Sequence, residues 1–278
     1  MTTSLTTRFP VPLCGLAYIF LLLLNAHAQT IDIRGAQSKL DDDKLVMRYT
    51  EFPKDGKIEF PRLFNPIRQV YWQPDNPDLQ RIPLSVEVLP ASWMLKCDAV
   101  PNSSVNGQFI VEVVGRMQLK LEQAIRAQPD GSFNLNACSG ITLGKMLRYE
   151  PQPHKNTVGY WTQSDDRVRW PIQIDRAGEF NIGILQGCGA GQGGSKAEFR
   201  LTGPVDPKIA FESTEPSKIV DSKEFEVLET GHFQNFQWRH IGQVSVTEPG
   251  IYFAEVVPIK IAKAALMDIR CIQLNRNP

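Results

Sequence analysis

Residues 187–195, GCGAGQGGS, are the stretch whose composition most resembles a reactive motif. A phosphate-binding loop of this kind lies between a strand and a helix whose N-terminus meets the phosphates. Here residues 196–201, KAEFRL, alternate in the manner of a strand, and no Lys-Ser or Lys-Thr pair completes a nucleotide loop. The glycines therefore predict a tight connection between strands, with contact to a ligand as the open alternative.

The other reactive side chains form no recognisable catalytic set. The four histidines lie at positions 27, 154, 232 and 240, with no serine or cysteine placed to suggest a triad. The cysteines beyond residue 28 lie in no C-x-x-C pair, so a zinc site is not expected. Disulfides are possible in an oxidising compartment, and the three possible pairings stay open. These cysteines are Cys97, Cys138, Cys188 and Cys271.

The N-terminal segment predicts export. Residues 11–24 are almost wholly apolar, and Ala26-His27-Ala28 follows as a small-x-small cleavage signature. This run is shorter than the roughly twenty residues that span a bilayer. We expect a signal peptide at residues 1–28, cleavage before Gln29, and a secreted or periplasmic protein. An uncleaved anchor is the alternative.

The charge pattern argues against nucleic acid as a partner. The chain carries 30 basic and 30 acidic residues, with no basic stripe of the kind that phosphate-backbone binding requires. No later segment is apolar enough to predict a membrane span.

Short alternating segments predict an all-β protein with two β-sandwiches. Turn signals such as Pro-Lys-Asp-Gly at 53–56 and Pro-Asp-Gly at 129–131 separate them. We assign residues 29–140 to the first sandwich, including a hairpin of 119–127 with 133–137, and residues 146–278 to the second. In the second, Val168, Trp170 and Ile172 share one face, and the spacing of the strands predicts a jelly roll.

The first block resembles a region of a known enzyme family. Residues 49–58, YTEFPKDGKI, and 61–67, PRLFNPI, are similar to the β-sandwich that follows the catalytic barrel in α-L-fucosidases of glycoside hydrolase family 29. Their chemistry needs two carboxyl groups on a (β/α)₈ barrel of about 250 residues, and no βα alternation occurs in this sequence. The resemblance therefore implies an accessory region without catalysis of its own.

The second block resembles carbohydrate-binding modules of families 6 and 35, which have a galactose-binding-like jelly roll. The resemblance rests on an ordered set of short segments rather than on one diagnostic motif. The segments are LRYE at 147–150, GYW at 159–161, AGEF at 177–180, the glycine-rich stretch, TGHF at 230–233 and MDIR at 267–270.

This second resemblance implies a sugar-binding set. Phe233 occupies the place of one stacking aromatic ring, and Tyr160 and Trp161 fall in the loop that carries the other. His232 and Lys263 are the polar groups nearby in the resembling arrangement. The alternative is that these rings are core residues. Strand alternation places Phe236, Trp238 and His240 together, and we expect them in the core with Trp170.

The same resemblance implies a possible structural calcium ion held by Glu150 and Asp268. Calcium takes six to eight oxygen ligands. One acidic ligand of the family pattern is replaced here by Arg148. The alternative is that these carboxylates pair with Arg148 or Arg270.

The sequence as a whole predicts a secreted, non-catalytic carbohydrate-binding or accessory protein related to the C-terminal region of α-L-fucosidases. Its expected partner is a polysaccharide or glycan, together with a separate glycoside hydrolase. One alternative is a structural module that docks onto such a hydrolase and binds no sugar. Another is a fragment of a longer enzyme.

Overall fold

The computed structural model describes residues 31–49, 55–97 and 106–277. The predicted signal peptide and residues 50–54 of the fucosidase-like motif lie outside them. The described chain is all-β, as predicted, and its helical content is one short 3-10 turn, η1 (Ala137–Ser139). Across these residues no helix is long and apolar enough to cross a bilayer.

The first sandwich packs a five-stranded sheet, in the order β1-β2-β8-β4-β5, against a three-stranded sheet, β3-β7-β6. Alternation in β2, β3 and β7 turns Met47, Phe60 and Trp93 into its core. The rings of Phe60 and Trp93 meet edge to face at 6.0 Å. The strands are β1 (Ala36–Asp41), β2 (Lys44–Tyr49), β3 (Lys57–Pro61), β4 (Ile67–Pro74), β5 (Ile82–Pro83), β6 (Ser85–Val88), β7 (Ser92–Lys96) and β8 (Gly107–Val113).

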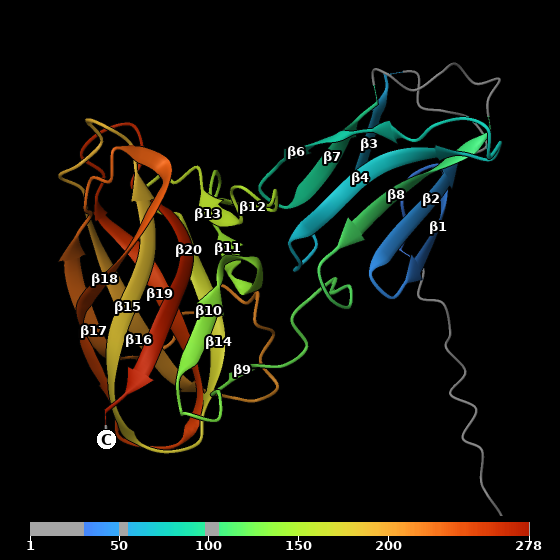
Figure 1. Cartoon of the computed structure of the whole chain (residues 1–278). Coiled ribbons are helices and arrows are strands. Elements are labelled where there is room, and N and C mark those ends of the chain that lie inside the picture. Colours follow the sequence, from blue (N-terminus) through green and yellow to red (C-terminus); the bar gives the residue numbers. More distant parts are fainter. Residues whose placement is uncertain (1–30, 50–54, 98–105, 278) are drawn as a thin grey trace, which may run out of the picture.

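The second sandwich contains two larger sheets (Figure 1). One has the order β12-β13-β20-β15-β18, with β10 also paired to β20, and the other has the order β11-β14-β19-β16-β17, with β9 paired to β14. The strands are β9 (Ile125–Arg126), β10 (Phe133–Asn136), β11 (Ile141–Leu143), β12 (Arg148–Glu150), β13 (Thr157–Gly159), β14 (Arg167–Ile174), β15 (Gly178–Cys188), β16 (Lys196–Val205), β17 (Ile219–Glu226), β18 (His232–Val246), β19 (Gly250–Lys260) and β20 (Asp268–Arg276).

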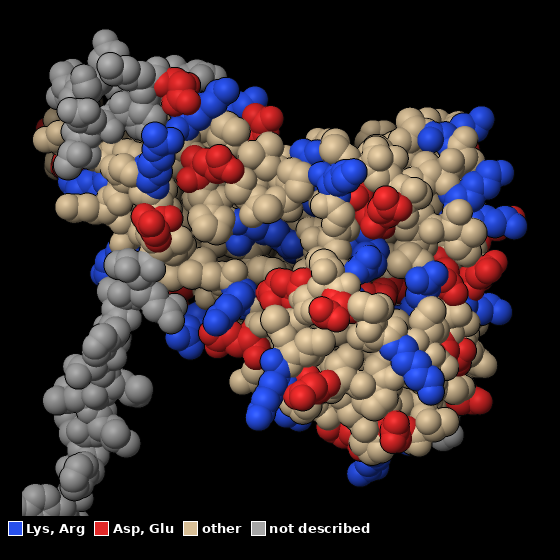
Figure 2. Space-filling model, turned by 180° about the vertical axis from the view of Figure 1, so that it is seen from behind, with Lys and Arg blue, Asp and Glu red and all other residues tan. Residues whose placement is uncertain are grey.

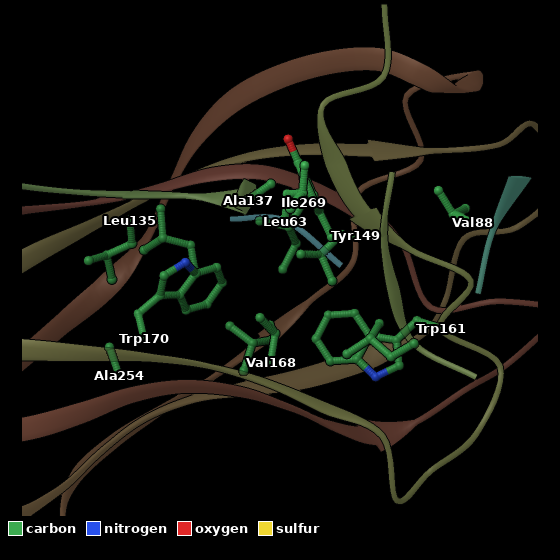
Figure 3. Packing of buried hydrophobic residues seen from close by; sticks show 14 of the residues in the cluster. Leu63, Val88, Leu135, Ala137, Tyr149, Trp161, Val168, Trp170, Ala254 and Ile269 are labelled. Atoms are coloured by element: carbon green, nitrogen blue, oxygen red, sulfur yellow. The ribbon is translucent and has the colours of Figure 1, made fainter. Parts of the chain in front are cut away.

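Strand alternation builds the core of this second sandwich. Val168, Trp170 and Ile172 all point inward from β14 and are fully buried, as the sequence predicted. Figure 3 shows Trp170 packed near Leu135. The strands are antiparallel apart from the short β9–β14 pair, which is parallel. This arrangement confirms the prediction of an all-β fold with a jelly-roll-like second sandwich.

The second sandwich begins earlier in the sequence than predicted. β10 pairs with β20, and β11 pairs with β14, so both belong to the second sandwich. The turn at Asp130 and Gly131 forms, with Gly131 at a φ of 82°. However, the segments on either side of this turn join opposite sheets, and assigning them to a hairpin of the first sandwich was wrong. Local turn chemistry cannot reveal this, because long-range pairing buries Phe133 in the second core. Separate folding of the two sandwiches stays a prediction.

The two sandwiches meet through buried contacts around Arg62. The Arg62 Nη2 atom donates to the carbonyl oxygen of Gly140 at 2.6 Å, and its guanidinium lies 5.2 Å from the centre of the Tyr149 ring. Tyr149 also approaches Trp93 of the first sandwich, with ring centres 6.1 Å apart.

Figure 2 shows basic and acidic side chains interspersed over one face of the molecule, as the zero net charge suggests.

Candidate functional site

Four loops gather at one end of the second sandwich, which we call the loop end. They are residues 160–166, 187–195, 228–233 and 261–266. The Leu266 amide donates to the Trp161 carbonyl at 2.9 Å, and the Ala190 amide donates to the Gly231 carbonyl at 3.1 Å. The Ala262 amide donates to Ser195 Oγ at 3.0 Å. Thus the structure brings together segments that lie about a hundred residues apart in the sequence.

The glycine-rich loop connects β15 to β16, and no helix follows it. Its glycines make room for Phe233: a Cβ on Gly189 would lie 2.8 Å from Cε2 of that ring, and one on Gly187 would collide with the Phe233 carbonyl oxygen. Phe233 is half-buried against this loop. The prediction of a tight connection between strands is confirmed, and the close approach accounts for the choice of glycine.

The two predicted polar partners, His232 and Lys263, are both exposed at the loop end. His232 Nδ1 accepts a hydrogen bond from the Gln234 amide at 3.0 Å, so its Nε2 is the ring nitrogen left to face a ligand. Lys263 lies between Ala262 and Ala264, whose amides bind Ser195 Oγ and Gln192 Oε1 of the glycine-rich loop. These contacts hold the backbone that carries the lysine.

Tyr160 is the exposed aromatic ring of the loop end. Its side chain is 44% exposed, and its backbone has a φ of 60°, a conformation that few residues other than glycine adopt. The Arg148 guanidinium lies 4.1 Å from the ring centre. Arg148 in turn donates to the carbonyl oxygens of Met146 at 3.1 Å and Val88 at 2.8 Å. The ring is therefore held in a defined position, and backbone strain of this kind is common at ligand sites.

Trp161 was predicted to share in stacking, and the structure contradicts this. Its side chain is 0% exposed, and its Nε1 donates to the Asp166 carbonyl at 2.9 Å. The left-handed backbone at Tyr160 sends the two neighbouring side chains in opposite directions, one to solvent and one to the core. Figure 3 shows Trp161 in the interior near Val168.

The prediction that Phe236, Trp238 and His240 are core residues was also wrong. Trp238 is 53% exposed and lies over Gly183, with 3.5 Å between Trp238 Cζ3 and the position of a Cβ on that glycine. The cause is a β-bulge, because the register of β15 with β18 shifts between Ile182 and Gly183. A bulge inserts one residue into one strand and so reverses which side chains face the core.

The structure brings the two predicted metal ligands together. A Cβ on Gly159 would lie 2.7 Å from Asp268 Oδ1 and 3.0 Å from Glu150 Oε1, and the two carboxylates are almost buried. The Lys155 ammonium pairs with Glu150, which differs from the expected alternatives, Arg148 and Arg270. Burial, and then the charge of Glu150, raises the pKa of Asp268 to about 8. Burial alone would lower the pKa of Lys155, but the hydrogen bond and charge attraction of Glu150 outweigh it, so that pKa is raised.

These residues do not fit a calcium ion. No group of three or more His, Cys, Asp or Glu side chains with suitable geometry occurs in the part of the chain that the structure describes. Calcium prefers six to eight oxygens, including several carboxylates. Here Lys155 already pairs with one of the two acidic groups.

Sequence reasoning missed a polar groove on the outer face of the β14–β19–β16 sheet. Its volume is about 620 Å³. Arg169 and Arg200 flank Glu255 on the neighbouring strands, and the Arg169 Nε atom donates to Glu255 Oε1 at 2.6 Å. Thr202 Oγ1 is buried in the groove without a hydrogen-bond partner. The alternation of arginine with apolar residues in 167–172 was the available signal, because it places the arginines on the outer face.

No known family model matches the chain, and no curated protein is similar enough to report. Solved structures similar to it include an α-L-fucosidase from Vibrio sp. strain EJY3, at 13% identity and a TM-score of 0.34, covering 87% of this chain. The chain spans 39% of the length of that fucosidase.

Two carbohydrate-binding modules are also similar to the chain. One is the C-terminal family 6 module of a marine laminarinase from Zobellia galactanivorans, at 18% identity and a TM-score of 0.39, covering 52% of this chain and 99% of the module. The other is a family 35 module from Clostridium thermocellum, at 11% identity and a TM-score of 0.38, covering 52% of this chain and 98% of the module. The structural neighbours thus include both kinds of protein that the sequence resembles. Since every one of these TM-scores is below 0.5, the likenesses are partial.

Proposed function

We propose that this chain is an exported, non-catalytic carbohydrate-binding protein, and that a glycan binds at the loop end of the second sandwich. The observation that carries the proposal is the way in which the structure holds the exposed ring of Tyr160. Its ring is 44% exposed, its φ is 60°, and its position is set by the guanidinium of Arg148. An exposed ring that is costly to hold in place is more consistent with a ligand contact than with packing.

The chemistry of the neighbouring groups fits a sugar. The apolar C–H face of a pyranose stacks on a flat ring, while its hydroxyl groups need hydrogen-bond donors and acceptors. Tyr160 supplies the ring, and the exposed side chains of His232 and Lys263 supply polar groups at the same end. Phe233 is half-buried and offers part of one ring face at most. Trp161 has no part in the proposed site because it is fully buried.

The non-catalytic part of the proposal rests on the surroundings of three buried acidic groups. Glu150 pairs with Lys155, and Glu255 pairs with Arg169. Asp166 accepts hydrogen bonds from the amides of Lys145 and Leu147 at 2.6 Å and 2.8 Å. Each of these carboxylates is engaged in holding the fold, which makes it a poor candidate for glycoside hydrolysis by paired acids.

One observation favours the second candidate function, a module that docks onto a separate hydrolase. Trp238 is 53% exposed on a sheet face, and large exposed aromatic residues are enriched at protein interfaces. In this case the loop end would bind no glycan, and the partner would cover β15 and β18.

Affinity gel electrophoresis in a panel of polysaccharides tests the proposal. The wild type, Tyr160→Ala and Trp238→Ala form a matched set, because each variant loses one exposed ring. We expect a glycan that retards the wild type and Trp238→Ala but retards Tyr160→Ala about tenfold less, by analogy with base stacking on aromatic residues. Loss of retardation in Trp238→Ala alone would place the site on the sheet face. A wild type that binds none of the glycans would favour the docking function.

A further inference from the structure

The loop between β12 and β13, residues 151–156, is built to place one lysine over two buried carboxylates. Arg270 clamps it from β20: its Nε donates to the Lys155 carbonyl at 3.0 Å, and its Nη2 donates to the His154 carbonyl at 2.8 Å. The other side of the Arg270 guanidinium lies 3.9 Å from the centre of the Phe236 ring. Because the clamp holds the carbonyl groups on both sides of the Lys155 Cα, the backbone position of Lys155 is fixed.

A second contact holds the end of the same loop. The Tyr149 hydroxyl donates to Asn156 Oδ1 at 2.8 Å, and Asn156 has a φ of 43°. Asparagine is among the residues that best tolerate this left-handed conformation. The chain therefore turns sharply after Lys155 and returns to the sheet at Thr157, whose Oγ1 donates to the Ile269 carbonyl at 2.8 Å.

The loop covers a site that requires a positive charge. Glu150 is 4% exposed and Asp268 is 8% exposed, and both carboxylates approach the same small space above Gly159. Ionising both carboxyl groups away from water would destabilise the fold strongly unless a cation compensated them. The Lys155 ammonium supplies that charge through its ion pair with Glu150.

We propose that the ammonium group of Lys155 takes the place of a divalent cation between Glu150 and Asp268, so that the loop end keeps its shape without calcium. The substitution is internal to the chain, since the lysine comes from the loop that covers the site. Tyr160 follows directly after Gly159, at the edge of this cluster. The Lys155 ammonium would fill this role whether or not the Tyr160 ring binds a glycan.

Thermal unfolding of the full chain with millimolar calcium or with a chelator tests this assignment. We expect the same melting temperature for the wild type in both conditions. Lys155→Met keeps the length of the side chain but removes its charge, and so leaves the two carboxylates for an added cation. Calcium at about a hundred times its dissociation constant should then raise the melting temperature of this variant by roughly 5–10 °C.

Two control variants test whether the calcium response depends on Lys155 and its carboxylate partners. Lys263→Met removes an exposed charge from the same end and should show no calcium response. The double variant Lys155→Met with Glu150→Gln removes one carboxylate as well, and the response should be lost. A saturable rise in melting temperature of the wild type with calcium would overturn the proposal, as would a folded Lys155→Met protein that ignores calcium.

A binding measurement covers the case in which Lys155→Met does not fold. Terbium substitutes for calcium at oxygen sites, and its luminescence is sensitised by nearby aromatic rings such as Tyr160. Titration of the wild-type chain with terbium should give no saturable signal at micromolar concentrations. A saturable signal that calcium displaces and that Asp268→Asn abolishes would show that the wild type holds a metal at this place and would refute the assignment.

Discussion

Trp161 and Tyr160 are adjacent in the sequence and should respond in opposite ways to truncation. Trp161 is fully buried and Tyr160 is 44% exposed. Removing a buried tryptophan typically costs about 3–5 kcal/mol in free energy of unfolding. For a chain of this size, each kcal/mol lowers the melting temperature by about 2–4 °C. Trp161→Ala should therefore melt about 6–20 °C lower than the wild type.

The hydrogen bond of Trp161 can be measured separately. Its Nε1 donates to the Asp166 carbonyl, which lies in the interior. Trp161→Phe keeps most of the apolar volume but leaves this carbonyl without its partner, at a cost of about 1–3 kcal/mol. Urea denaturation followed by circular dichroism gives these free energies directly.

Tyr160→Ala is the matched control at the neighbouring position. Its ring contributes little burial, so the free energy of unfolding should change by less than about 1 kcal/mol. Replacing a residue that has a φ of 60° by glycine, in Tyr160→Gly, should relieve backbone strain and offset even this loss. A Trp161→Ala protein as stable as the wild type, or a Tyr160→Ala protein that loses more stability than Trp161→Ala, would refute the reasoning about this loop.

Four further predictions follow from contacts elsewhere in the molecule. Gly187→Ala should lower the free energy of unfolding by on the order of 1–3 kcal/mol, because the added Cβ meets the Phe233 backbone. Gly191→Ala has open space around it and should cost only the strain of its positive φ, and urea denaturation compares the two variants. Arg62→Ala should cost about 1–3 kcal/mol for each buried carbonyl that it leaves unpaired, and differential scanning calorimetry should show the two sandwiches melting less cooperatively. A chain beginning at residue 115 should fold, while one beginning at 143 loses β9, β10 and most of β11 and should be less stable or insoluble. Limited proteolysis and circular dichroism would distinguish these outcomes. Burial raises the pKa of Cys271 to about 11, so its alkylation in the native state at pH 8 should be slow and should accelerate as the pH rises toward that value. Mass spectrometry follows the reaction, and an alkylation rate in the native state equal to the rate in urea would contradict this prediction.

Several elements of the fold were readable from the sequence. Alternation of apolar and polar residues predicted that Val168, Trp170 and Ile172 share one face of a strand, and all three are buried on one face of β14. The Pro-Asp-Gly turn at 129–131 forms where it was predicted. These features are local, since side chains in a strand alternate with a period of two and turn residues act through their own backbone angles.

The same local rules failed where a distant contact decided the outcome. The bulge opposite Gly183 exposes Trp238, although its segment alternates as a core strand would. The turn at 129–131 was predicted correctly, but the strands on either side of it pair with β14 and β20 in opposite sheets. In both places the local sequence predicts a strand or a turn, but it does not predict which distant strand will pair with that segment.

In the candidate site, too, some features were predicted from the sequence and others depend on the tertiary structure. The resemblance of short segments to known modules selected Glu150, Asp268, Tyr160 and His232, and the structure places all four at or beside one end of the second sandwich. That selection rested on the resemblance of an ordered set of short segments to those modules. They could not decide that Trp161 turns inward, because that depends on the unusual backbone angle of the residue before it.

The sequence by itself determined that the chain is all-β, and the resemblance of its short segments to known modules indicated which of them meet at the loop end. Only the tertiary structure decided which side chains there face solvent and which cation balances the buried acids. Lys155 stands five residues after Glu150 and gives no signal as its partner, and Asp268 is more than a hundred residues away. Burial and charge compensation depend on distances in space, and these are fixed only when β12, β13 and β20 have come together.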